Sequence, residues 1–149
     1  MKQKRPEWTD YFMKIAEDVS ARATCLRRRY GAVVVDVNNK IVSTGYCGAP
    51  TGKPNCIDIN KCKRQELNAP RGERYELCES VHAEMNALIQ GDASRMIGST
   101  IYIYGVDADT GDRCNGAPCD ICERMVRNAG ISRVVYYNAD GALIMRPSL

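Results

Sequence analysis

The chain has 149 residues, enough for one domain that buries its own core without disulfides or other cross-links. A net charge of +3 gives little support to a nucleic-acid-binding protein. No apolar stretch is long enough to span a bilayer, and the basic start of the chain lacks the apolar run of a secretory signal. We therefore expect one domain over residues 1–149, in the cytoplasm, with no membrane partner.

The first predicted elements are a helix and a β-hairpin. Apolar side chains fall at helical spacing near the start of the chain, with charged residues on the outward positions. These apolar residues are Trp8, Tyr11, Phe12, Ile15, Ala16, Val19 and Ala23. After a basic connection, β-branched runs at 32–36 and 40–44 predict a hairpin. The glycine-bounded turn at 45–50 is a place where the backbone can approach a ligand closely.

The segment from Thr51 to Ser80 is long, polar and without clear periodicity. Connections of this length are uncommon in compact domains unless they are functional or held in place. The chain contains eight cysteines, which indicate metal ligands rather than disulfides when no secretory signal is present. Cys56, Cys62 and Cys78, together with Cys25, could form a closed zinc site. Their spacing is not that of a paired Cys-x-x-Cys knuckle, so four separate reduced thiols are the alternative.

Helices and strands alternate after residue 80. A helix beginning at His82 is predicted first, followed by a strand at 100–104. A polar loop then leads to a second helix, with Pro118 at its first position and Gly130 as its C-terminal signal. A strand at 134–137 precedes a turn and a short tail. This order predicts an α/β fold with a mixed sheet and helices on both faces.

His82, Cys119 and Cys122 are a candidate ligand set for zinc. One imidazole and two thiolates are three protein ligands, which leaves the fourth tetrahedral position to water, as in catalytic zinc sites. Zinc lowers the pKa of such a water to about 7. Glu84 is too close in sequence to His82 to be an obvious fourth ligand, and we expect it to pass a proton from water to a leaving nitrogen. The alternative is a metal-free Cys-x-x-Cys motif, but the two motifs together are far more specific than either one.

The His-x-Glu and Pro-Cys-x-x-Cys motifs make the chain resemble the cytidine/deoxycytidylate deaminase superfamily, in particular the deoxycytidylate (dCMP) deaminases. The similarity extends from about Tyr11 to Tyr137. The segments that match the family's pattern are Thr24-Cys25-Leu26-Arg27, Tyr30-Gly31-Ala32-Val33, Ser43-Thr44-Gly45-Tyr46, Asn55-Cys56, Val81 through Leu88, and Pro118 through Cys122. The resemblance implies a three-layer α/β/α sandwich with a roughly five-stranded mixed sheet. It also implies a zinc-dependent hydrolase that converts dCMP to dUMP and ammonia and so supplies thymidylate synthesis.

The resemblance assigns substrate contacts to four residues. The backbone N–H of Ala83 would meet the pyrimidine carbonyl, Arg27 would bind the phosphate, and Tyr136 would lie near the base. The family's turn usually reads Gly-Tyr-Asn-Gly, and its asparagine contacts the sugar. Cys47 occupies that position here, and a thiol lacks both the length and the hydrogen-bonding groups of an amide. The loop at 106–116 is also longer than usual, and its cysteine is expected to be a surface thiol.

The resemblance also implies a second, structural zinc ion. Cys25 and Cys56 match two of its ligands, and Cys62 and Cys78 are the residues available for the other two. We therefore expect one catalytic and one structural zinc ion per chain. A closed four-cysteine site would stiffen the wall of the substrate pocket.

Two classes of function are compatible with these motifs. Within the enzyme class, the alternative substrates are dCTP, a free nucleoside such as cytidine, or adenosine in transfer RNA, although the small net charge argues against RNA. The other class is a binding or regulatory protein that is held together by zinc and has no activity. The presence of Glu84 argues against this class, since a purely structural zinc needs no group to transfer protons. The resemblance further implies a homo-oligomer, often a hexamer, with dCTP and dTTP as allosteric effectors.

Overall fold

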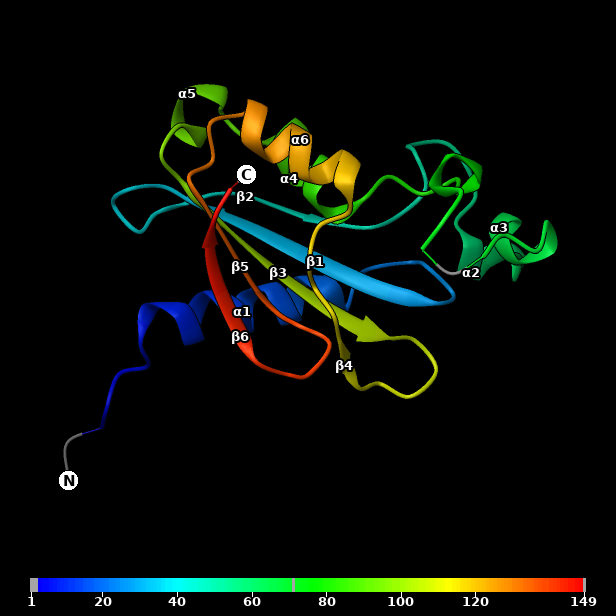
Figure 1. Cartoon of the computed structure of the whole chain (residues 1–149), viewed down its shortest axis with the longest axis horizontal. Helices are drawn as coiled ribbons and strands as arrows, with labels where there is room; N and C mark the ends of the chain where they lie inside the picture. The colour runs from blue at the N-terminus through cyan, green and yellow to red at the C-terminus, as the bar shows by residue number, and fades with distance from the viewer. Residues whose placement is uncertain (1–2, 71, 149) are drawn as a thin grey trace.

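The computed structural model describes residues 3–70 and 72–148 as a mixed β-sheet with helices on both faces (Figure 1). The strand order is β2-β1-β3-β5-β6, and a sixth strand, β4, pairs with β3 outside this path. Only β3 and β5 are parallel. The bounds are β1 Arg28–Val35, β2 Ile41–Tyr46, β3 Thr100–Asp107, β4 Arg113–Cys114, β5 Arg133–Tyr137 and β6 Leu143–Pro147. The three-layer α/β fold is therefore confirmed, with six strands instead of about five.

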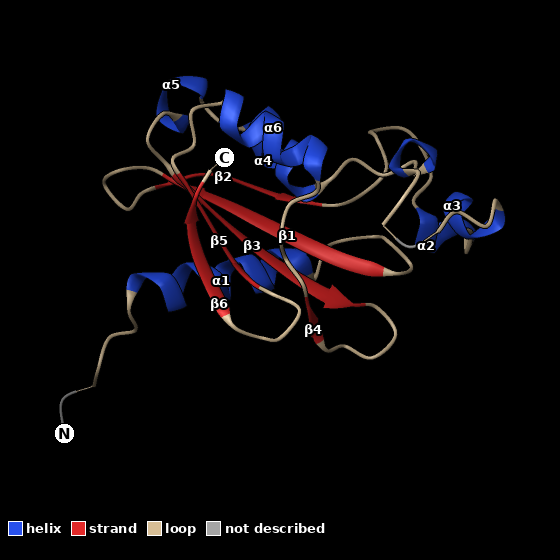
Figure 2. Cartoon of the chain, in the orientation of Figure 1, coloured by secondary structure: helices blue, strands red, loops and turns tan. Residues whose placement is uncertain are grey.

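The helices form two layers and one separate group (Figure 2). Helix α1 (Trp8–Ser20) covers one face of the sheet, and α4 (Ala83–Gln90), α5 (Ala93–Met96) and α6 (Asp120–Asn128) cover the other. The short helices α2 (Cys56–Ile59), α3 (Lys63–Glu66) and η1 (Tyr75–Leu77) lie together beyond one end of the sheet. We call this group, residues 51–80, the cysteine lobe. None of the helices in the described ranges is long and apolar enough to cross a membrane.

Two hydrophobic cores lie on opposite faces of the sheet. Consecutive residues of β1 alternate between them, since side chains along a strand point to opposite faces. Ala32 and Val34 belong to the core under α4 and α6, whereas Val33 and Val35 pack against α1. All four are buried, so β1 is an interior strand that is covered on both faces.

Glycine allows two helices to approach the sheet closely. A Cβ at Gly45 in β2 would meet the backbone of Ala83 and Ala87 in α4. A Cβ at Gly31 in β1 would similarly meet the backbone of α1 at Ala16 and Ser20. Because Gly45 lies under the first turns of α4, it sets the height of that helix above the sheet.

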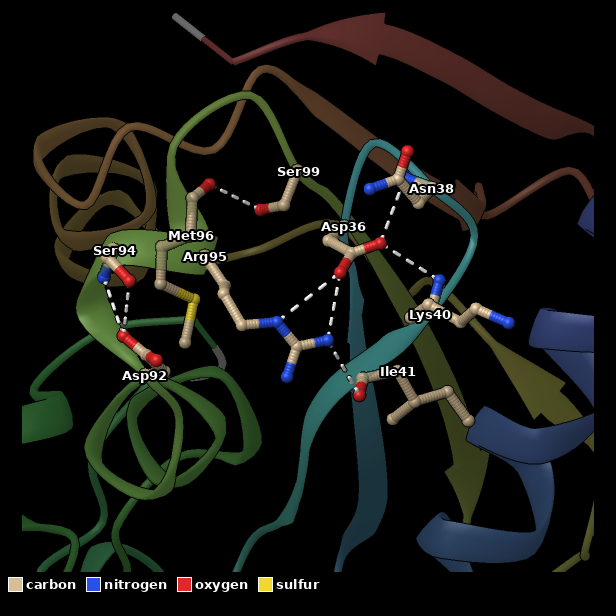
Figure 3. Close-up of polar contacts among 9 residues, drawn as sticks. All are labelled: Asp36, Asn38, Lys40, Ile41, Asp92, Ser94, Arg95, Met96 and Ser99. Atoms are coloured by element: carbon tan, nitrogen blue, oxygen red, sulfur yellow. Dashed lines mark hydrogen bonds and ion pairs between the residues drawn. The ribbon is translucent and has the colours of Figure 1, made fainter.

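The hairpin between β1 and β2 is tied to α5 by an ion pair (Figure 3). Arg95 Nη2 lies 2.8 Å from Asp36 Oδ2, and Arg95 also donates to the carbonyl oxygen of Ile41. Asp36 in turn accepts from the backbone N–H groups of Asn38 and Lys40 in the turn. The hydrogen bond from Arg95 lowers the pKa of the Asp36 carboxyl.

A second ion pair joins β6 to α6. Arg146 Nη1 and Nη2 each lie 2.8 Å from a carboxylate oxygen of Glu123, a bidentate pair that is largely shielded from solvent. Arg146 Nε donates to the hydroxyl of Tyr136 on the neighbouring strand. The last strand therefore fixes α6 from its outer side.

Three details differ from the sequence-based predictions. Helix α6 begins at Asp120, so Pro118 precedes the N-cap residue Cys119 and does not occupy the first helical position. Strands β4 and β6 were not predicted: β4 has only two residues, and β6 lies in the segment interpreted as a short tail. Helix α5 and the short helices of the cysteine lobe were not predicted either, since four residues are too few to show helical periodicity.

Candidate active site

The structure brings His82, Cys119 and Cys122 together. His82 is the N-cap residue of α4, Cys119 is the N-cap residue of α6, and Cys122 lies in the first turn of α6. His82 Nδ1 lies 3.5 Å from Cys119 Sγ and 3.3 Å from Cys122 Sγ. The three potential ligand atoms lie within 4.8 Å of one another. This is the spacing of a single metal site, built from residues about 40 positions apart in the chain.

The donor set and its surroundings fit a zinc ion. An imidazole nitrogen with two sulfur atoms is a ligand set typical of zinc. Both α4 and α6 begin at the cluster, and the positive end of a helix dipole favours thiolate over thiol. The Cys122 backbone N–H donates to Cys119 Sγ over 3.5 Å, so the helix end itself supplies a hydrogen bond to a ligand.

The Cys119 thiol is polarised toward ionisation, whereas Cys122 is held in its protonated form. The hydrogen bond from the Cys122 thiol lowers the pKa of Cys119 to about 4, and His82 contributes in the same direction. The same hydrogen bond, together with burial, raises the pKa of Cys122. Both cysteines must be thiolates to bind a metal ion, so metal binding must displace the proton of Cys122.

Glu84 lies beside the ligand cluster, in the first turn of α4. Its side chain is only 5% exposed. Burial raises the pKa of the carboxyl group, and a hydrogen bond with the Cys122 thiol opposes that shift. A raised pKa moves a carboxyl group toward the range in which a general acid–base group works.

A cavity of about 330 Å³ opens next to this cluster. Its inner wall includes His82, Ala83, Glu84 and Cys119, so the cluster and the proposed acid–base group face the same space. The volume lies at the small end of the range for ligand sites in proteins. The arrangement therefore suits a small substrate whose reacting atom meets the cluster.

The substrate-contact residues expected from sequence lie in two different places. Ala83, Arg27 and Cys47 line the cavity. Tyr136 is not among the lining residues: its ring packs in the core between the sheet and α6, and its hydroxyl accepts a hydrogen bond from Arg146. The structure thus brings three of the four expected contacts to the site.

Cys47 is part of the cavity wall but is held by the backbone around it. Its sulfur accepts a hydrogen bond from the Tyr30 N–H at 3.4 Å and lies 3.8 Å from the Arg28 carbonyl oxygen. Burial raises the pKa of Cys47 to about 12, so the group is a neutral thiol at physiological pH. It offers substrate a small, weakly polar surface.

Of the four remaining expected ligands, Cys56, Cys62 and Cys78 lie in the cysteine lobe, and Cys25 lies between α1 and β1. Cys25, Cys62 and Cys78 line the cavity. Burial raises the pKa of the Cys56 thiol, and negative charge on any of the other three cysteines would raise that pKa further, which indicates that Cys56 lies near all three. Within the described residues, however, only the His82 cluster brings three ligand atoms within 4.8 Å. The four sulfur atoms are thus neighbours without the spacing of a completed metal site.

Arg64, Tyr75 and Arg28 also line the cavity, and no sequence pattern identified them. The Arg64 guanidinium carbon lies 4.6 Å from the centre of the Tyr75 ring, and that ring meets His82 edge-on at 5.9 Å. In the sequence, Arg28 is one of three consecutive arginines after the first helix, and nothing distinguishes it from the other two as a residue of the cavity wall. Arg64 and Tyr75 lie in the segment without periodicity, where nothing marks a residue as buried.

Comparison with known proteins agrees with the geometry. Residues 6–138 match the family model described as the cytidine and deoxycytidylate deaminase zinc-binding region. A deoxycytidylate deaminase of Mycobacterium phage D29 is 36% identical over 137 residues, covering 89% of this chain and 95% of the relative. The deoxycytidylate deaminase of Schizosaccharomyces pombe is 34% identical over 139 residues, covering 91% of this chain and 39% of the relative. The chain thus spans well under half of the yeast protein.

A solved structure is also similar. The dCMP deaminase from the cyanophage S-TIM5, in complex with dCMP and dUMP, superposes with a TM-score of 0.61 at 27% identity. The similarity covers 91% of this chain and 85% of that one. Together with the family match over most of its length, these findings show that the chain belongs to the cytidine and deoxycytidylate deaminase family of hydrolases.

Proposed function

We propose that this protein hydrolyses dCMP to dUMP and ammonia. The observation that carries the proposal is the placement of the buried Glu84 carboxyl beside the His82, Cys119 and Cys122 cluster in one small cavity. The names of the relatives, deoxycytidylate deaminases, support dCMP as the substrate. The dUMP formed would supply thymidylate synthesis.

We assign His82, Cys119 and Cys122 to a catalytic zinc ion. When bound, the metal supplies a Lewis acid that makes a water molecule acidic enough to be deprotonated near pH 7. Glu84 would accept a proton from the attacking water and donate it to the nitrogen that leaves as ammonia. The water oxygen would replace this nitrogen on the pyrimidine ring as a carbonyl oxygen, and the second proton of the water would end on the ring nitrogen N3. Atoms and charge balance without a further co-reactant.

Substrate orientation is assigned to groups on the cavity wall. The first backbone N–H groups of a helix have no partner within the helix, and Ala83 is the first residue of α4. Its N–H would donate to the pyrimidine carbonyl oxygen. Arg27 would contact the phosphate at the outer part of the cavity, while Cys47 forms a neutral part of the wall that would meet the sugar.

We further propose that Cys25, Cys56, Cys62 and Cys78 bind a second, structural zinc ion. Their proximity supports this, as do backbone hydrogen bonds to sulfur: Arg27 N–H donates to Cys25 and Ser80 N–H to Cys78, each at 3.4 Å. Such hydrogen bonds commonly support metal-bound ligands. Metal analysis of the purified protein should give two zinc ions per chain, and Cys78→Ser should give one. A wild-type value of one would remove the structural site.

The substrate is tested by following loss of the cytosine ultraviolet band with dCMP, dCTP, CMP and deoxycytidine. Turnover of dCMP well above the other three compounds is the expected result. Turnover of another compound would keep the chemistry and change the substrate. No turnover of any of them by zinc-loaded protein would favour a binding or regulatory role.

Assembly and regulation are proposals from the family resemblance. We expect a cytoplasmic homo-oligomer, a hexamer in the simplest case, with dCTP and dTTP as effectors. Analytical ultracentrifugation with and without each nucleotide tests both expectations. A monomer that is indifferent to either nucleotide would contradict them.

A further inference from the structure

Arg64 is a buried cation without a carboxylate partner. The residue is 9% exposed, yet its side chain lines the cavity. Nε donates to the Glu73 carbonyl oxygen, and Nη2 donates to the carbonyl oxygens of Pro70 and Glu73. These bonds orient the guanidinium group but do not neutralise its charge. Among residues 3–70 and 72–148, no ion pair involves Arg64.

One nitrogen of Arg64 is free to bind a ligand. No described residue accepts a hydrogen bond from Nη1, and this atom is not among the buried polar atoms that lack a partner, so it retains accessible surface. A buried charge is costly unless an opposite charge or strong hydrogen bonds compensate it. An uncompensated guanidinium beside a cavity therefore indicates a site for an anion.

Most of the charged side chains that line the cavity are positive. Arg27 and Arg28 line it together with Arg64, whereas Glu84 is the only carboxylate in the lining of the described residues. Backbone hydrogen bonds and, more weakly, Arg28 lower the pKa of Asp107, so the charge of Arg28 is partly balanced, whereas no described carboxylate forms an ion pair with Arg27 or Arg64. Clustered cations in a low-dielectric cleft attract anionic ligands.

Tyr75 fixes the position of Arg64 relative to the reacting centre. The Tyr75 ring lies between the guanidinium group and His82, in contact with both. A nucleotide whose pyrimidine ring meets the cluster must extend its sugar and 5′-phosphate along the cavity away from His82. Arg64 lines the same cavity, and its guanidinium group lies over the ring that meets His82.

We propose that Arg64 recognises the 5′-phosphate of the nucleotide and is a specificity-determining residue for phosphorylated over unphosphorylated substrates. The proposal rests on the nucleotide substrate proposed above. The new element is that a residue of the cysteine lobe recognises the phosphate, so the lobe takes part in selecting the substrate. Planar guanidinium is well suited to this role, because it can donate two parallel hydrogen bonds to a phosphate.

The test compares ligands with and without phosphate. Calorimetric binding of dUMP and deoxyuridine is measured for the wild-type holoenzyme and for Arg64→Gln, Arg64→Lys and Lys63→Gln. We expect Arg64→Gln to weaken dUMP binding by about 10- to 100-fold, as for loss of a charged hydrogen bond, and to leave deoxyuridine unchanged. Arg64→Lys should recover part of the loss. Lys63→Gln is the matched control, since Lys63 is an exposed neighbour in α3 paired with Glu79.

The same variants separate this proposal from the proposed activity. KM for dCMP should rise in Arg64→Gln while kcat changes little, and both parameters for deoxycytidine should stay as in wild type. Equal weakening of dUMP and deoxyuridine, or an unchanged preference for dUMP, would overturn the role of Arg64. Loss of zinc from Arg64→Gln together with equal weakening would show that Arg64 only supports the lobe. Failure of the wild type to deaminate any compound would refute the proposed activity, while the dUMP preference would still report on Arg64.

Discussion

The His82 cluster and the cysteine lobe both gather cysteines around the same cavity, but they are supported in different ways. The cluster lies at the ends of two helices that pack on the sheet, and Ala83, Ala87 and Cys122 are fully buried there. The lobe consists of short helices: α2 buries no residue and α3 buries only Arg64. Ile57, Ile59 and Leu67 remain about half exposed.

This difference shows which site depends on its metal. Packing of α4 and α6 on the sheet positions the cluster before any ion binds, so a ligand set can exist in the metal-free protein. The lobe has few apolar contacts to offset the entropy of ordering about thirty residues, and a cross-linking ion would supply what packing does not. Four changes test this contrast.

The largest effect is expected from Glu84→Gln. Because the core holds the cluster, zinc content and melting temperature should remain near wild type. Loss of the acid–base group should reduce kcat by about 10³-fold or more. Steady-state assays on dCMP, with metal analysis of the same sample, measure both effects. Turnover at the wild-type rate would refute the role of Glu84.

Removal of metal should affect the two regions unequally. After chelation, amide hydrogen exchange in residues 51–80 should accelerate strongly, since little packing remains to hold that segment. Exchange in α4 and α6 should change less, because their apolar faces stay buried. Similar loss of protection in both regions would contradict the contrast between them. Restoration of slow exchange by added zinc is the control for irreversible damage.

Gly45→Ala should weaken the support of the cluster directly. The new methyl group would meet the backbone of α4 and push that helix away from β2, at a cost of about 1–3 kcal/mol in the free energy of unfolding. Urea denaturation measures the loss, and kcat should fall with it. Gly48→Ala is the matched control, because a Cβ there would lie 3.2 Å from the movable Thr24 hydroxyl oxygen. Equal stability of the two variants would show that α4 is not seated on Gly45.

The smallest effect is expected from Arg95→Gln, which lies far from both cysteine groups. Arg95 lowers the pKa of Asp36, so the pair stabilises the fold when pH is above the unfolded value near 3.8 and loses this contribution as pH falls through the folded value. The variant should be slightly less stable than wild type at neutral pH. The difference should vanish in acid well below pH 3.8. A difference that persists there would mean that Arg95 acts through packing.

The sequence predicted the elements that are marked by a repeated apolar pattern or by a residue typical of a helix end. The first helix, the hairpin, and the positions of α4 and α6 follow from periodicity and from end signals such as Gly130, which has the expected positive φ. The ligand cluster followed from residue types and spacing alone. These features rest on local rules, and the structure moved their ends by up to four residues, at the start of β1.

The rest depended on contacts between distant segments. Tyr136 lies on the face of β5 that is covered by α6, as a residue near the base would. Its position along the strand, however, places the ring in the core, where its hydroxyl binds Arg146 and does not reach the cavity. Arg64 and Tyr75 meet only because the lobe folds back on itself, so no window of sequence records their stacking. The approach of α4 to β2 was likewise hidden, since Gly45 resembled an ordinary turn glycine.

The bond between β6 and α6 has a consequence for synthesis of the protein on the ribosome. Arg146 reaches back to Glu123, so the helix that carries Cys119 and Cys122 gains this support only after residue 146 has left the exit tunnel. Helix α1, β1 and β2 leave the tunnel earlier and can pair before then. The ion pair therefore forms after the hairpin during translation, and it joins the helix of the two cysteines to a strand made later.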